Sequence, residues 1–159
     1  MTIRSNLHGT GRRASAFVRR RQRFAVEQSA LAFSIVGARN ASINGRKTAS
    51  RIAYDLTNND VLIVSGMARG IDAAAHKGAM YAQEQCGPTA AVLEPASMFP
   101  TLRKTLHLYE QIKQNGVIVS ESPLGTQPNA ANFPRRNRIV AGLGLGTLVV
   151  EATLTFRVP

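Results

Sequence analysis

The chain is poor in several residue types, and each scarcity excludes a class of protein. It has one cysteine, Cys86, no tryptophan and few aromatic residues in its 159 positions. A single cysteine excludes an intrachain disulfide and a zinc site built on several thiolates. No apolar run reaches the ~18 residues that a membrane-spanning helix needs, so we expect no membrane partner. The length suggests one domain with a real hydrophobic core.

Acidic residues are also scarce, and the excess of positive charge is uneven. Nine Asp and Glu residues stand against 20 Lys and Arg, which gives a net charge of +11. Residues 1–31 contain seven arginines and one acidic residue, Glu27, so they carry +6 of this charge. Both parts of the chain are basic, and a polyanion is the expected partner.

Residues 1–31 show no clear periodicity and no cluster of large apolar side chains. We interpret them as a basic, disordered arm, followed by an ordered domain over 32–159. Arg-rich, Ser-containing and acid-poor beginnings are also typical of organellar transit peptides and of leaders unrelated to the domain. Composition alone does not distinguish these alternatives.

From residue 33 onward, short apolar runs alternate with segments of helical periodicity. The runs at 33–37, 61–64, 89–93, 117–120 and 148–150 predict strands, and 45–58, 71–84 and 101–115 predict helices. Because the strands are continuously apolar, the pattern favours an α/β fold with a mostly parallel sheet covered by helices on both faces. In such doubly wound sheets, ligands bind beyond the carboxyl ends of the strands.

Polar residues follow three of these predicted strands. Arg39 follows the first, Ser65 and Arg69 follow the second, and Glu121 with Ser122 follows the fourth. Since the carboxyl ends of parallel strands meet at one edge of the sheet, we predict that these residues gather on one rim.

The stretch 64–76, Val-Ser-Gly-Met-Ala-Arg-Gly-Ile-Asp-Ala-Ala-Ala-His, predicts a strand, a turn and a helix start. Ser65, Gly66 and Gly70 keep the turn free of bulk, and Arg69 adds a positive charge beside the helix N-terminus. This arrangement favours an anion such as phosphate. In the alternative interpretation, Asp72 in the first helical turn satisfies those backbone amides and no ligand binds.

A second basic stretch lies at 133–138, Phe-Pro-Arg-Arg-Asn-Arg, after a long proline-containing loop. Guanidinium groups for phosphates and an aromatic ring for a base are what a single-stranded nucleic-acid site requires. Pro134 fits the first position of a helix. A solvated basic helix start is the alternative interpretation.

Catalytic and metal-binding patterns are weak. His8, His76 and His107 show no spacing typical of a metal site or a triad, so we expect no metal and no acid–base catalysis. Gly142 to Gly146 precede a strand instead of following one, which argues against a dinucleotide fingerprint. Glu151, at the end of the last strand, is expected either to cap a helix or to face the rim.

Four segments together resemble the DNA-processing protein A (DprA/Smf) family. They are Ile35 to Arg39, Val64 to His76, Val119 to Thr126 and Phe133 to Leu143. The resemblance runs from about residue 32 to 152 and implies a Rossmann-like domain of the bacterial cytoplasm. It also implies a non-enzymatic protein that needs no cofactor, binds and protects single-stranded DNA, and helps to load the RecA recombinase in natural transformation. Family members work as dimers.

Motif by motif, the resemblance implies a set of DNA-binding residues. These are Gly37, Arg39, Ser65, Gly66, Arg69, Gly70, Asp72, Phe133, Arg135, Arg136, Asn137 and Arg138. We expect Arg39, Arg69 and Arg135 to clamp phosphates and Phe133 to stack on a base.

The chain departs from the family pattern in two places. Residues 94–100 replace a glycine-rich loop, and after Ala152 the usual Ser-Gly-Ser helix and further strand are missing. We therefore predict a sheet that is incomplete at its C-terminal end. An inactive truncated remnant is therefore one alternative function. A second alternative is a phosphoribohydrolase similar to the lysine-decarboxylase-like proteins. The Gly-Gly-x-Gly-Thr turn and following glutamate of those proteins are partly matched by Gly144 to Thr147 and Glu151.

Overall fold

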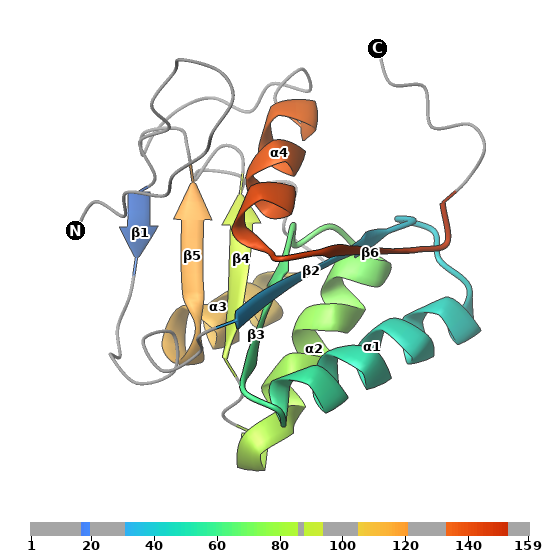
Figure 1. Ribbon diagram of the computed structural model, residues 1–159, viewed down its shortest axis with the longest axis horizontal. Coiled ribbons are helices and arrows are strands. Elements are labelled where there is room, and N and C mark those ends of the chain that lie inside the picture. Colours follow the sequence, from blue (N-terminus) through green and yellow to red (C-terminus); the bar gives the residue numbers. More distant parts are fainter. Residues whose placement is uncertain (1–16, 20–30, 86–87, 94–104, 121–132, 153–159) are drawn as a thin grey trace.

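The computed structural model describes residues 17–19, 31–85, 88–93, 105–120 and 133–152. In these ranges a six-stranded sheet has the order β1-β5-β4-β3-β2-β6 (Figure 1). The strands are β1 (Phe17–Arg19), β2 (Leu31–Gly37), β3 (Val61–Ser65), β4 (Thr89–Leu93), β5 (Val117–Ser120) and β6 (Thr147–Val150). The five strands from β2 to β6 are parallel, whereas β1 pairs antiparallel with β5. The predicted mostly parallel sheet is confirmed.

One short strand comes from the segment that the sequence predicts as a basic arm. In β1, Phe17 lies opposite Ser120 and Arg19 opposite Ile118. Residues 1–16 and 20–30 lie outside the described residues, so the predicted disorder of the arm stays a prediction.

Helices cover both faces of the sheet. They are α1 (Ile43–Thr57), α2 (Ile71–Gln85), α3 (Leu106–Asn115) and α4 (Phe133–Leu143). The first three pack on one face, and α4 lies on the other (Figure 1). The predicted doubly wound, Rossmann-like arrangement is confirmed, including the helix that begins around Pro134.

The core follows from the alternation of side chains along each strand. Ile35, Ile63 and Ile118 point to the face of α1, α2 and α3. Their neighbours Val64 and Val119 point to the face of α4. Because both faces are covered, a central strand such as β4 is buried along its whole length, which explains the continuous apolar runs.

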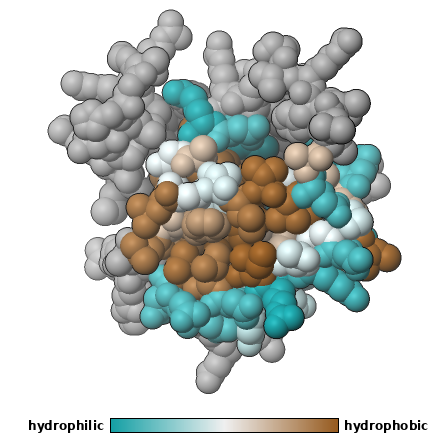
Figure 2. Space-filling view, turned by 45° about the vertical axis from the view of Figure 1, so that its right-hand side comes forward, coloured by the Kyte–Doolittle hydropathy of each residue, from teal (hydrophilic) through white to brown (hydrophobic). Residues whose placement is uncertain are grey.

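The edge of the sheet at β6 is less covered. Leu31, Leu145 and Val149 are between 50% and 77% exposed. Figure 2 shows a hydrophobic band across the middle of this side of the molecule, between more polar surfaces above and below. An exposed strand edge with apolar side chains is a surface that proteins normally cover.

Helices α1 and α2 approach each other closely through small residues. Ala49 and Ala53 of α1 are fully buried, as are Ala75 and Ala79 of α2. At Gly78 an added Cβ would collide with the backbone of Ser50, whose Cα would lie 2.8 Å away. The position therefore requires glycine for packing.

We predict that Gly78→Ala destabilises the fold. Forced separation of two packed helices costs about 1–3 kcal/mol, which exceeds the ~1 kcal/mol gained from better helix propensity. Urea denaturation checks this, with Lys77→Ala on the exposed side of the same helix as the control. A Gly78→Ala variant as stable as the control would contradict the close contact.

Candidate nucleic-acid interface

Three chain segments interlock at the carboxyl edge of the sheet. The backbone N–H of Ile71 donates to the carbonyl of Ala38 at 3.2 Å, which joins the turn after β3 to the turn after β2. The N–H of Ala38 donates to the carbonyl of Glu151 at 3.0 Å, which adds the end of β6. The predicted rim therefore exists for the strand ends that the structure describes, and these bonds fix its shape.

The turn from β3 to α2 has an unusual backbone. Met67 and Gly70 both have positive φ, 61° and 87°. Met67 is 3% exposed and packs in the core, which holds a conformation that a non-glycine residue rarely adopts. At Gly70 a side chain would collide with the carbonyls of Ala38 and Arg39. The neighbouring Arg69 is exposed as a result.

The Asp72 carboxylate lies at the helix N-terminus where the sequence suggests that an external anion could bind. Its carboxylate Oδ2 accepts from the backbone N–H of Ala68 at 3.3 Å. The pKa of Asp72 is raised, because the effect of burial exceeds the opposite effects of the Arg136 charge and of the backbone N–H groups of Ala68, Gly37 and Gly66. The alternative in which Asp72 satisfies amides of this turn is thus the one observed.

Arg136 reaches the same place from the opposite face of the sheet. It is 6% exposed, and its Nη1 donates to the carbonyl of Gly66 and, at 3.1 Å, to that of Val92. A Cβ at Gly66 would overlap the Arg136 guanidinium and lie 2.8 Å from the Asp72 carboxylate. Glycine is required there because a guanidinium and a carboxylate occupy the space beside it.

Burial corrects part of the expected DNA-binding set. Ser65 is fully buried and its Oγ donates to the carbonyl of Ile35 at 2.6 Å. Asp72 and Arg136 are also buried, so direct contact of these three side chains with DNA does not fit this geometry. The spacing of Arg136 with Ile139, Val140 and Leu143 on the inner face of α4 is a signal of this orientation in the sequence.

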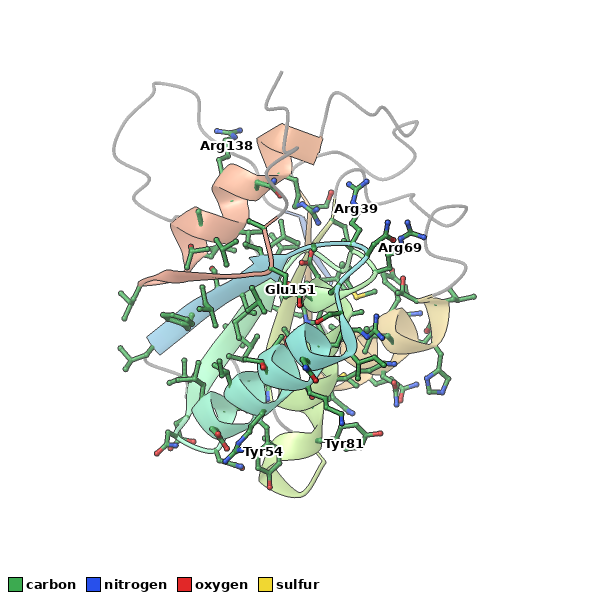
Figure 3. All side chains as sticks on the ribbon, turned by 90° about the vertical axis from the view of Figure 1, so that its right-hand side faces the viewer. Arg39, Tyr54, Arg69, Tyr81, Arg138 and Glu151 are labelled. Carbon is green, nitrogen blue, oxygen red and sulfur yellow. The ribbon has the colours of Figure 1, made fainter. Side chains whose placement is uncertain are left out.

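Four of the described residues of the set are exposed, namely Arg39, Arg69, Asn137 and Arg138. Figure 3 shows Arg39 and Arg69 extending from neighbouring turns toward the same end of the molecule, with Arg138 on α4 across from them. Gly37 ends β2, where a Cβ would lie 2.8 Å from the Ile71 side chain. The side chains of Phe133 and Arg135, and residues 94–104 and 121–132, lie outside the described residues.

Glu151 caps a helix. Its carboxylate accepts from the N–H of Ser42 at 2.7 Å and from the Ser42 hydroxyl. The hydroxyl of Ser42 accepts in turn from the N–H of Gly45 at 2.9 Å, so both residues stabilise the start of α1. These contacts lower the pKa of Glu151. Of the two expectations for this residue, the helix cap is confirmed. Its partner Ser42 could not be identified from the sequence, because the two residues are 109 positions apart.

His76 belongs to the interior. It is fully buried, and its Nδ1 lies 2.7 Å from the Thr89 hydroxyl, which itself donates to the carbonyl of Ile63. We assign the Nδ1–H tautomer from this network. Desolvation, and to a lesser extent the Arg136 charge, lower the pKa of His76 to about 3, although the Ser65 carbonyl acts to raise it. The ring is neutral near pH 7, and the expected absence of acid–base work stays a prediction.

Within the described ranges, no helix is long and apolar enough to cross a membrane. In that same part of the chain, no three His, Cys, Asp or Glu side chains are grouped so that they could hold a metal ion.

Comparison with known proteins assigns the chain to a family. The family model described as DNA recombination-mediator protein A matches residues 23–155. The chain belongs to the DprA family. It is 42% identical over 122 residues to protein Smf of Escherichia coli and 38% identical over 123 residues to DNA processing protein DprA of Streptococcus pneumoniae. These alignments cover 76% of this chain but 32% and 42% of the relatives, so the chain spans less than half of their length.

Two solved structures share the fold. DprA of Streptococcus pneumoniae has a TM-score of 0.74 and 31% identity, and covers 88% of this chain and 47% of its own. DNA processing protein A of Helicobacter pylori has a TM-score of 0.76, 24% identity and coverage of 89% and 62%. The second is described for a unique single-stranded DNA binding mode of that protein. The resemblance seen in the four sequence segments is therefore confirmed at the level of family and fold.

We predict that Asp72→Asn strongly destabilises this DprA-family chain. The substitution removes the acidic group whose charge acts on the buried Arg136 guanidinium, and leaving a buried charge uncompensated costs about 3–5 kcal/mol. Asp55→Asn is the matched control, because Asp55 forms an exposed pair with Arg51 at 3.9 Å and such pairs contribute ~1 kcal/mol at most. Equal losses in urea denaturation would refute the supporting role of Asp72.

We also predict a specific loss of stability in acid. Because the folded pKa of His76 is about 3 and its ordinary value is 6.5, the unfolded chain binds a proton first as the pH falls. The contribution of neutral His76 to the free energy of unfolding is complete above pH 6.5. It is lost as the pH falls toward 3, by up to ~1.4 kcal/mol per pH unit. Stability measured against pH should have a shallower slope in His76→Gln, whereas His107→Gln, at an exposed position, should keep the wild-type slope.

Proposed function

We propose that this chain binds single-stranded DNA at the rim and serves a DNA-processing role. The proposal rests mainly on Arg39 and Arg69. Their exposed guanidinium groups come from different strand ends and extend toward the same end of the molecule (Figure 3). Guanidinium groups held by fixed turns suit the phosphates of a nucleic acid. The family match and the single-stranded DNA binding described for the Helicobacter pylori protein support this choice of ligand.

The residues of the set have different roles in this proposal. Arg39, Arg69 and Arg135 clamp phosphates, Phe133 stacks on a base, and Asn137 and Arg138 line the same side of α4. The turn glycines Gly37, Gly66 and Gly70 give the backbone its shape. Ser65, Asp72 and Arg136 position these groups from inside the protein.

The proposed role is that of a recombination mediator without enzymatic activity or cofactor. It protects incoming single-stranded DNA and assists RecA loading in natural transformation, in the bacterial cytoplasm. The partners are therefore single-stranded DNA, RecA and a second copy of this chain. The apolar band at β6 supports the second copy, since an exposed strand edge favours association.

The phosphoribohydrolase alternative is weakened by the place of Glu151. That carboxylate accepts two hydrogen bonds from Ser42 at the start of α1, which leaves it poorly suited to act on a substrate. Release of free base from a nucleoside monophosphate by the purified chain would revive this alternative. No DNA binding and no base release would favour the inactive remnant.

We predict that Arg39→Ala and Arg69→Ala each weaken binding of labelled oligo-dT. Each lost phosphate contact should reduce the slope of log K against log salt by ~0.7. Fluorescence anisotropy at several salt concentrations measures both quantities. Lys113→Ala is the control, because it removes the same charge from α3, where Lys113 pairs with Glu110 at 2.8 Å.

A variant with Arg4, Arg12 and Arg13 replaced by glutamine tests the basic arm in the full chain. Loss of binding in this variant, with normal binding in the Arg39→Ala and Arg69→Ala double variant, would place the DNA on the arm and overturn the rim assignment. The reverse pattern supports the rim.

A further inference from the structure

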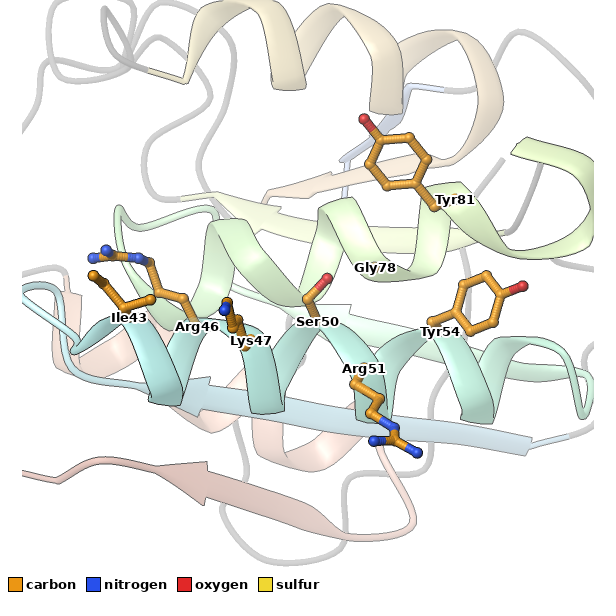
Figure 4. Close-up of a pocket in the computed structure, with 8 residues that line it drawn as sticks. All are labelled: Ile43, Arg46, Lys47, Ser50, Arg51, Tyr54, Gly78 and Tyr81. Carbon is orange, nitrogen blue, oxygen red and sulfur yellow. The ribbon is translucent and has the colours of Figure 1, made fainter.

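A groove of about 440 Å³ runs along the outer side of α1 and α2, away from the sheet. Its lining comes from both helices (Figure 4). From α1 come Ile43, Arg46, Lys47, Ser50, Arg51 and Tyr54, and from α2 come Gly78 and Tyr81. The α1 residues recur every three or four positions, so they form one continuous stripe on that helix. The close approach of Gly78 to Ser50 forms the floor between the helices.

Two tyrosines mark the far end of the groove. Tyr54 is 43% exposed and Tyr81 is 67% exposed, whereas the third tyrosine of the chain, Tyr109, is 6% exposed. Figure 4 shows the two rings at the same end, one on each helix. Because both rings are partly exposed, part of each is available to stack on planar groups.

Positive charge lies along the rest of the groove. Arg46 is held by a hydrogen bond from its guanidinium to the carbonyl of Ala41 at 2.7 Å, at the end near the rim. Lys47 is exposed one position further along α1. In Figure 4 Arg51 extends from α1 away from α2, and it pairs with Asp55 at 3.9 Å, so acidic charge is also present.

The groove begins close to the rim. Helix α1 starts only four residues after Arg39, and its 15 residues extend over about 22 Å. In Figure 3, Tyr54 and Tyr81 lie at the end of the molecule opposite Arg39 and Arg69. A strand bound at the rim would therefore meet the cations first and the rings last.

We propose that the α1–α2 groove binds the continuation of the single-stranded DNA that leaves the rim. This inference rests on the proposed function and adds a second segment to its binding path. Arg46 and Lys47 hold phosphates, and Tyr54 and Tyr81 stack on bases. Cations followed by exposed rings match single-stranded nucleic acid, since every base offers a face for stacking, whereas an acidic protein segment would need the charges alone.

The test compares oligo-dT of two lengths by fluorescence anisotropy. One oligomer of about six nucleotides fills the rim only, and one of about twenty also reaches the groove. Replacement of both tyrosines by alanine should weaken the longer oligomer about tenfold or more and leave the shorter one unchanged. Replacement of both by phenylalanine keeps the rings and should stay within about twofold of wild type. Lys47→Gln should weaken only the longer oligomer, with Lys113→Gln as its control.

Failure of the groove is distinguishable from failure of the proposed function. Equal binding of the longer oligomer by wild type and the double alanine variant, together with weak binding by Arg39→Ala, would refute DNA binding in the groove and support DNA binding at the rim. Photocrosslinking of a longer oligomer carrying iodouracil gives an independent readout. Crosslinks to Tyr54 or Tyr81 support the path, and their absence, when crosslinks form elsewhere on the chain, contradicts it.

Discussion

The rim of this domain depends on a guanidinium and a carboxylate that are both buried. Arg136 from α4 and Asp72 from α2 meet beside Gly66, where neither is accessible to solvent. Charges removed from water are tolerated only when hydrogen bonds and opposite charge replace the water. Here the carbonyls of Gly66 and Val92 and the amide of Ala68 supply the bonds. Because these bonds must all be made together, they fix the positions of the ends of β3 and β4 relative to the starts of α2 and α4.

This inner layer explains the form of the outer one. The turn after β3 holds Met67 and Gly70 at positive φ, and Gly70 packs against the turn that carries Arg39. Arg69 lies between these two fixed residues, so its guanidinium starts from a backbone that cannot easily rearrange. Two arginines presented from interlocked turns lose less conformational freedom when they bind phosphates than two on independent loops.

The sequence predicts the fold well because its signals are local. Apolar runs and helical spacing identify the parallel sheet and its helices, and strand ends identify the rim. Asp72 at the turn amides is one of the two interpretations of the stretch 64–76. The inward position of Arg136 is harder to predict, because adjacent basic residues on a helix are divided between solvent and interior only by how the helix packs. Glu151 and Ser42 are further from prediction, since their contact joins residues 109 positions apart. A local pattern carries no information about such a pair.

Rim and groove would both hold DNA by contacts with phosphates and by stacking, and these two interactions respond differently to salt. Contacts between guanidinium groups and phosphates release counterions and weaken as salt rises, whereas stacking on tyrosine rings depends little on ionic strength. A strand bound across both would lose its phosphate contacts at Arg39 and Arg69 and at Arg46 and Lys47 as salt increases, and would keep contact longest at Tyr54 and Tyr81. The far end of the path then limits full dissociation. The slope of log K against log salt should be steeper for long oligomers than for short ones, because only the long ones reach Arg46 and Lys47, and the affinity that remains at high salt should depend on the rings.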